Sequence, residues 1–192
     1  MTRLPTLSAL GSELARVLNN ENHAGDNRTW WSRFAVKCLD PARYKLREVT
    51  LRSRFRGLGR PEYLVDVAWI AGRLQAPPVR YRGILLAAEI EWGGTLTHLW
   101  EDFPKLVDIQ AERKVFVGNI RGGRKRATTF VTDVVKMLRD HRGASKGERY
   151  FISLWEKSRG DGFLGAWIVS AAGRHKEWRA SKDGNLHEVQ PR

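Results

Sequence analysis

Three acidic residues stand within or at the end of apolar segments, where carboxylates are uncommon. Asp66 lies inside the run LVDVAW, and Glu89 and Glu91 close a run that begins at Ile84. A carboxylate in a buried strand loses its hydration, which is unfavourable unless a cation or hydrogen-bond donors replace the water. Side chains two residues apart on a strand point to the same face, so Glu89 and Glu91 are expected to be like-charged neighbours.

A divalent cation is one partner that would satisfy these three acids. Mg²⁺ binds one or two carboxylates together with waters and phosphate oxygens, and Mn²⁺ prefers similar oxygen ligands. Asp66, Glu89 and Glu91 are therefore candidate metal ligands. The alternative is that each acid pairs with one of the 34 Lys and Arg residues. The five histidines show no metal-ligand spacing, so the acids alone carry this prediction.

The overall charge favours a polyanionic partner. Lys and Arg number 34 against 21 Asp and Glu, which gives a formal net charge of +13. Basic side chains that neutralise phosphates release counterions, so nucleic acid, and duplex DNA in particular, is the expected partner. An anionic membrane surface and solubility alone remain alternatives. A membrane-surface protein would usually carry its basic residues on one amphipathic helix, whereas here they are spread over predicted loops and strands.

The densest basic segment, RGGRKR at 121–126, is predicted to be a flexible loop that contacts nucleic-acid backbone. It lacks the Gly-Lys-Ser/Thr ending of a phosphate-binding loop. Its candidate contacts are Arg121, Arg124, Lys125 and Arg126, and further candidates on a predicted exposed strand are Arg52 and Arg54.

Hydrophobic spacing and turn residues predict a mixed α/β chain. Helices are expected at 7–19, 28–39 and 128–141, and a fourth begins with Asp102 as its N-cap. Strands are expected at 44–55, 62–70, 83–92, 114–120, 150–156 and 163–170, the last two forming a hairpin. The order strand, helix, strand over 83–120 implies a parallel pair. Glu177–Arg179 is expected to add a short edge strand, and 181–192 is expected to be a polar tail.

Length and cysteine content bound the organisation of the chain. A chain of 192 residues with 42% hydrophobic residues is expected to form one domain with its own core. The single cysteine, Cys38, cannot form an intrachain disulfide, which fits a reducing compartment. No apolar run reaches the roughly 20 residues of a membrane span, and the first residues lack the apolar core of a signal peptide. A cytoplasmic location without membrane attachment is therefore expected.

The order hairpin, Asp66, Glu89-Ile90-Glu91, helix, buried strand resembles the core of the PD-(D/E)XK nucleases, which have the restriction-endonuclease-like fold. The resemblance spans about residues 12–120 and implies an α-β-β-β-α-β core. The helix and hairpin over 121–180 would be additions to it. Two positions depart from the family pattern: Val65 replaces the proline before the aspartate, and Glu91 stands where most members have lysine.

The resemblance implies roles for individual residues. Asp66 and Glu89 would bind the metal together with the backbone carbonyl of Ile90. Glu91 would be a third ligand or a proton acceptor. Lys105, on the following helix, would supply a cation from a shifted position.

Many family members also carry a glutamate on the first helix. Glu13 is the candidate here, and Glu48 is the competing acid. The sequence thus predicts a Mg²⁺- or Mn²⁺-dependent endonuclease that hydrolyses the phosphodiester bonds of DNA, with restriction, repair and mobile-element roles all open. A non-catalytic nucleic-acid-binding module with the nuclease fold is the alternative, and a homodimer is left open.

Overall fold

The computed structural model describes residues 4–20, 35–53, 64–72, 81–141, 147–156, 162–180 and 186–189. Residues 35–38 are helical, whereas the first part of the helix predicted over 28–39 lies outside the described residues. Arg54 and most of the turn predicted between the last two strands also lie outside them.

A mixed sheet of eight strands, in sequence order from one edge to the other, forms the centre of the described chain. β1 to β3 pair antiparallel, β3 to β5 pair parallel, and β5 to β8 pair antiparallel again. The strands are β1 (Val49–Ser53), β2 (Val67–Ala71), β3 (Ile84–Gly94), β4 (Arg113–Ile120), β5 (Tyr150–Trp155), β6 (Phe163–Ser170), β7 (Gly173–Ala180) and β8 (Leu186–Glu188). The predicted mixed α/β class and the predicted parallel pair are therefore confirmed.

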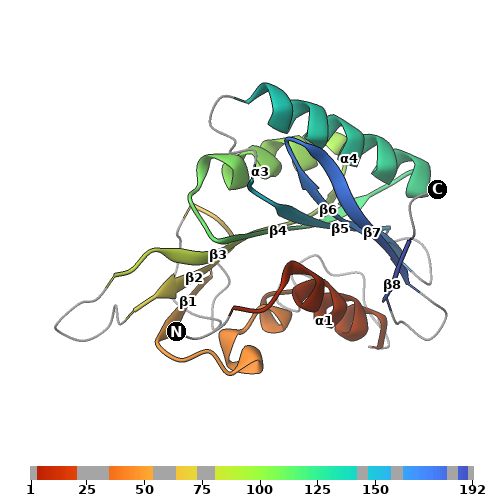
Figure 1. Ribbon diagram of the computed structural model, residues 1–192. Helices are drawn as coiled ribbons and strands as arrows, with labels where there is room; N and C mark the ends of the chain where they lie inside the picture. Colours follow the sequence, from red (N-terminus) through yellow and green to blue (C-terminus); the bar gives the residue numbers. More distant parts are fainter. Residues whose placement is uncertain are drawn as a thin grey trace.

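Helices cover both faces of the sheet, as Figure 1 shows. α3 (Leu96–Asp108) and α4 (Gly123–Asp140) lie on one face, and α1 (Leu7–Asn20) lies on the other. Each face has its own apolar core, one containing Leu14 of α1 and the other Phe103 of α3. Successive residues of a strand point to opposite faces of the sheet, so one set of alternate side chains packs toward α1 and the other set toward α3 and α4.

Alternation along β3 shows this division directly. Ala88 and Ile90 belong to the core on the α1 side, whereas Ala87 belongs to the core on the α3 side. On the neighbouring strand a Cβ at Gly118 would lie 2.8 Å from Leu99 Cδ2 of α3, so this helix packs directly on the β4 backbone. Glycine at 118 thus brings α3 close to the C-terminal half of β3.

The predicted start of α3 is wrong. Thr95, not Asp102, is the N-cap, and its hydroxyl oxygen accepts a hydrogen bond of 3.3 Å from the His98 N–H. The prediction relied on Pro104, because proline is usual in the first turn of a helix. Pro104 lies inside α3 instead, where it removes one helical hydrogen bond, and packing of the apolar face of α3 on the sheet compensates for that loss.

The predicted basic loop at 121–126 is also wrong, because α4 begins at Gly123. Gly122 and Gly123 have φ values of 103° and 71°, so the glycines form the sharp turn from β4 into the helix. The side chain of Glu156 accepts a hydrogen bond of 3.0 Å from the Gly122 N–H. A carboxylate from a distant strand end thus occupies the position of a helix cap, which local sequence could not reveal.

Two further elements differ from the prediction. The strand expected over 44–55 begins only at Val49, after the 3₁₀ helix η1 (Pro41–Tyr44). The predicted short strand at 177–179 is part of the longer β7, and the predicted polar tail contains β8. The ion pair of 2.7 Å between Lys176 and Glu188 joins these two strands.

Candidate functional site

Antiparallel pairing of β2 and β3 brings Asp66 and Glu89 together. Val67 pairs with Ala88, so continuing this register by one residue places Asp66 opposite Glu89. Asp66 is 2% exposed and Glu89 is 1% exposed. The Asp66 Oδ2 atom accepts a hydrogen bond of 2.8 Å from the Ile90 N–H. We call Asp66 and Glu89 the acid pair.

The acid pair lies on the face of the sheet that α3 and α4 cover. Glu89 is two residues beyond Ala87, whose side chain belongs to the core under these helices. Asp66 is likewise two residues before Ala68, which belongs to the same core. Two carboxylates therefore enter an otherwise apolar layer, as the sequence predicted.

Lys105 of α3 is within electrostatic reach of the acid pair. Burial lowers the pKa of Lys105, but its hydrogen bond to Asp102 and the negative charges of Glu89, Asp102 and Asp66 together raise that pKa above its ordinary value. The Lys105 Nζ atom donates to Asp102 Oδ1 at 2.5 Å, and the lysine side chain is 44% exposed. Lys105 is therefore protonated at neutral pH, and its positive charge interacts with both members of the acid pair.

Glu91 lies further along β3 and has a different contact. Its Oε1 atom accepts a hydrogen bond from the Gly93 N–H. A Cβ on Gly93 would lie 2.6 Å from this oxygen and 2.0 Å from His98 Nδ1, so only glycine fits between the two side chains. The sequence did not point to His98, because its place in the first turn of α3 becomes visible only with the correct start of that helix.

Two carboxylates, together with waters and phosphate oxygens, form a ligand set that Mg²⁺ accepts, and Asp66 and Glu89 are the residues that would hold it. Within the residues that the structure describes, no group of three or more His, Cys, Asp or Glu side chains is spaced to hold a metal ion. Glu91 is thus not gathered with Asp66 and Glu89 into one ligand set. Its role as a third ligand stays a prediction.

Glu13 is not brought to the acid pair. It lies on α1, on the opposite face of the sheet, and its Oε1 atom is 2.6 Å from Arg43 Nη1 in an ion pair. The competing acid, Glu48, is exposed and stands just before β1 with a φ of 53°. Neither glutamate therefore lies beside the acid pair.

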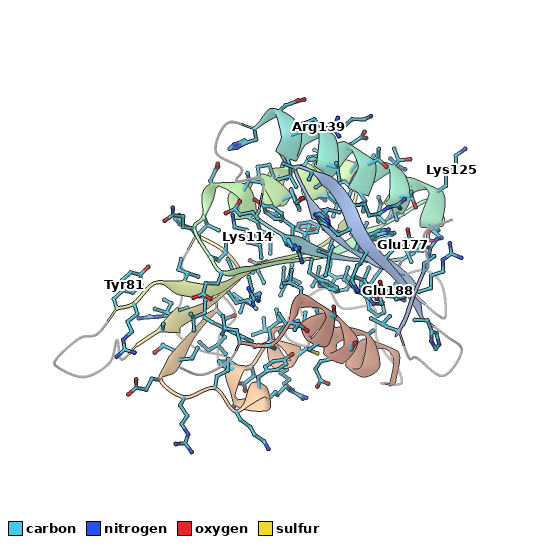
Figure 2. All side chains as sticks on the ribbon, in the orientation of Figure 1. Tyr81, Lys114, Lys125, Arg139, Glu177 and Glu188 are labelled. Carbon is cyan, nitrogen blue, oxygen red and sulfur yellow. The ribbon has the colours of Figure 1, made fainter. Side chains whose placement is uncertain are left out.

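Of the basic residues predicted to bind nucleic acid, one makes contacts within the fold and others are exposed. Arg124 Nη1 donates to the Leu164 carbonyl at 2.6 Å, and its Nη2 pairs with Glu177. Arg121, Lys125 and Arg126 are exposed, and Figure 2 shows Lys125 projecting from the N-terminal end of α4.

Arg52 of β1 lies closer to the acid pair in the sheet. It pairs with Ala68 of β2, so it shares the face of Asp66 and is half-buried. A basic side chain therefore stands on the strand next to Asp66, on the same side of the sheet.

Sequence reasoning missed Glu156, which directly follows β5. It is 5% exposed and accepts a hydrogen bond from the Gly122 N–H at the start of α4. The signal was present, since Glu156 closes an apolar strand just as Glu89 and Glu91 do. Its contact with a helix terminus gives it a structural partner.

The fold and the site thus define a mixed α/β protein with helices on both faces of its sheet and a buried acid pair beneath α3. No family model matches the chain, and neither a curated protein nor a solved structure shows significant similarity to it. Among the described helices, none has both the length and the apolar composition to cross a membrane.

Proposed function

We propose that this chain is a metal-dependent nuclease that hydrolyses phosphodiester bonds of DNA, with a Mg²⁺ or Mn²⁺ ion held by the acid pair. The observation that carries the proposal is the placement of two carboxylates, 2% and 1% exposed, which face each other when the β2–β3 register is extended by one residue. Two like charges in this position destabilise the folded chain unless cations offset them. A divalent cation would offset both.

The order of elements supports the same assignment. α1, β1, β2, β3, α3 and β4 follow one another along the chain, and β4 lies beside β3 and parallel to it. This is the α-β-β-β-α-β order that the resemblance to the PD-(D/E)XK nucleases implies. Asp66 directly precedes β2 and Glu89 stands on β3, and these are the strands with which that resemblance associates the metal-binding acids.

The chain's own residues suggest how a phosphodiester would be held. When bound, a divalent cation makes its coordinated water more acidic and neutralises phosphate charge. Lys105 has a pKa above its ordinary value, so it is poorly suited to accept a proton and well suited to stabilise negative charge on the phosphate. Asp66 is oriented by the Ile90 N–H, which keeps one of its oxygens fixed.

The exposed basic residues would then position the nucleic-acid backbone. Gly94, the last residue of β3, pairs with Ile120, the last residue of β4, and Arg121 follows directly. The basic segment therefore begins at the end of the sheet that is nearer to Glu91 of β3. Lys125 and Arg126 are exposed on the first turn of α4. Arg124 is occupied within the fold and would contribute less to this contact.

A plasmid-nicking assay with Mg²⁺, Mn²⁺ or chelator tests the proposal. The wild type should nick DNA only with a divalent cation, and Glu89→Gln should abolish nicking while DNA binding is kept. Lys105→Gln should slow nicking by about a hundredfold. Asp133→Asn, which alters an exposed ion pair on α4, is the matched control and should leave the rate unchanged.

The alternative is a DNA-binding module without catalysis. The absence of a three-residue metal-binding group among the described residues favours it. Salt-dependent DNA binding without nicking under every metal condition would support this alternative and contradict the nuclease proposal. A cytoplasmic location, with the buried thiol of Cys38 kept reduced, is part of either proposal.

A further inference from the structure

A hollow of about 670 Å³ lies at the end of the sheet where β4 and β5 begin. The start of α1, the start of β4, the residues before β5 and part of β7 line it, and neither residue of the acid pair does. Its volume falls within the range of roughly 300–1,000 Å³ that is usual for small-molecule sites. The hollow is thus separate from the proposed catalytic site.

One acid that lines this hollow, Glu148, is already neutralised. Lys114 is 1% exposed, and its Nζ atom donates to Glu148 Oε1 at 2.9 Å. The hydroxyl of Tyr150 donates to the other oxygen, Glu148 Oε2, at 2.8 Å. Both carboxylate oxygens of Glu148 therefore have donors, and its charge is balanced by Lys114.

The remaining charges in the hollow are mostly positive. Arg113, Arg149 and Lys176 line it with His175, against the single further acid Glu112. Lys176 also pairs with Glu188 of β8, but an ammonium group has three donors and one contact leaves others available. The lining therefore favours an anion over a neutral or cationic ligand.

The Arg113 guanidinium is already oriented by hydrogen bonds to the backbone. Its Nε donates to the Pro5 carbonyl at 3.3 Å and its Nη1 to the Glu112 carbonyl at 2.9 Å. A guanidinium has five N–H donors, so two backbone contacts set its plane and leave further donors for a ligand. The entropy lost on binding is smaller for a side chain that is already fixed.

The other walls suit the remainder of a phosphorylated ligand. Leu7 and Ser8 stand in the first turn of α1, where backbone N–H groups lack partners within the helix and favour negative charge. Ala111 and Ile168 add apolar surface, and the hollow is much larger than one phosphate group. We propose that it binds a nucleoside phosphomonoester, either as a free nucleotide or as the phosphorylated end of a nucleic-acid strand.

Calorimetric titration of the full chain tests this proposal without any need for nuclease activity. Adenosine monophosphate is expected to bind, inorganic phosphate to bind more weakly, and adenosine not to bind. Preference for an oligonucleotide with a terminal phosphate over its hydroxyl form would identify a strand end as the source. Preference for adenosine monophosphate over both would identify a free nucleotide.

The matched variants are Arg149→Gln in the hollow and Arg139→Gln on the outer side of α4 (Figure 2). Arg149→Gln should weaken nucleotide binding by about tenfold, as expected for the loss of one charge-assisted hydrogen bond. Arg139→Gln should leave it unchanged. The proposal is overturned if no phosphorylated probe binds, if adenosine binds equally well, or if the two variants lose affinity equally, since that would show attraction to net charge alone.

Discussion

Two clusters of buried charge lie on the same face of the sheet, and they differ in how their charges are balanced. The acid pair brings two carboxylates into the layer under α3, with the partly exposed Lys105 as a nearby cation. The second cluster consists of Lys114, Glu148 and Tyr150, and we call it the lysine cluster. In this cluster the Lys114 ammonium donates to one carboxylate oxygen of Glu148, and the Tyr150 hydroxyl donates to the other.

The difference separates a stabilising cluster from a candidate site. Removal of one partner of a buried ion pair is strongly destabilising, because the other charge is left buried without its counter-charge. The acid pair, by contrast, is the place where we propose that a divalent cation binds. Substitutions in the lysine cluster should therefore change the free energy of unfolding, and substitutions in the acid pair should change metal binding.

The largest effect is expected at the lysine cluster. Lys114→Met keeps a side chain of similar volume but leaves Glu148 without its cation. Since Glu148 is 25% exposed, the loss of unfolding free energy should lie toward the lower end of the about 3–5 kcal/mol typical of a broken buried pair. Urea unfolding measures it, and a loss well under 1 kcal/mol would show that Lys114 is not a structural cation.

A smaller effect is expected when the phenol of the lysine cluster is removed. Tyr150→Phe deletes the donor to Glu148 Oε2, so unfolding free energy should fall by about 1.5 kcal/mol at neutral pH.

The same residue should produce an alkaline pH dependence. Burial, the hydrogen bond to Glu148 and the charges of Glu148 and Asp108 all raise the pKa of Tyr150. The protonated phenol is thus favoured by folding. Its contribution is complete below the unfolded pKa of about 10 and is lost as pH rises toward the folded value. Tyr44 and Lys105 also have raised pKa values, so Tyr150→Phe should make the alkaline loss of stability shallower without abolishing it. An identical pH profile in wild type and variant would contradict this account.

The smallest effect on stability is expected at the acid pair. In chelator, Glu89→Gln should leave the unfolding free energy level or raise it by up to about 1 kcal/mol, because it removes one of two facing like charges. Added Mg²⁺ or Mn²⁺ should then raise the melting temperature of the wild type more than that of the variant. A large loss of stability in chelator, with equal responses to metal, would instead make Glu89 half of a structural ion pair.

The sequence by itself determined the central strands and the position of the acids. Apolar runs bounded by turn residues marked β2 and β3, and the desolvation of carboxylates in those runs marked Asp66, Glu89 and Glu91 as unusual. These features are local, because each depends on residues a few positions apart.

Only the tertiary structure decided the partners and the helix boundaries. Lys114 meets Glu148 across 34 residues, and Arg124 meets Glu177 across 53. Thr95 rather than Asp102 begins α3, because packing on the sheet outweighs the preference of Pro104 for a first turn. Charge pairing and the ends of packed helices depend on residues that folding brings together, and their separation along the chain hides them from any local pattern.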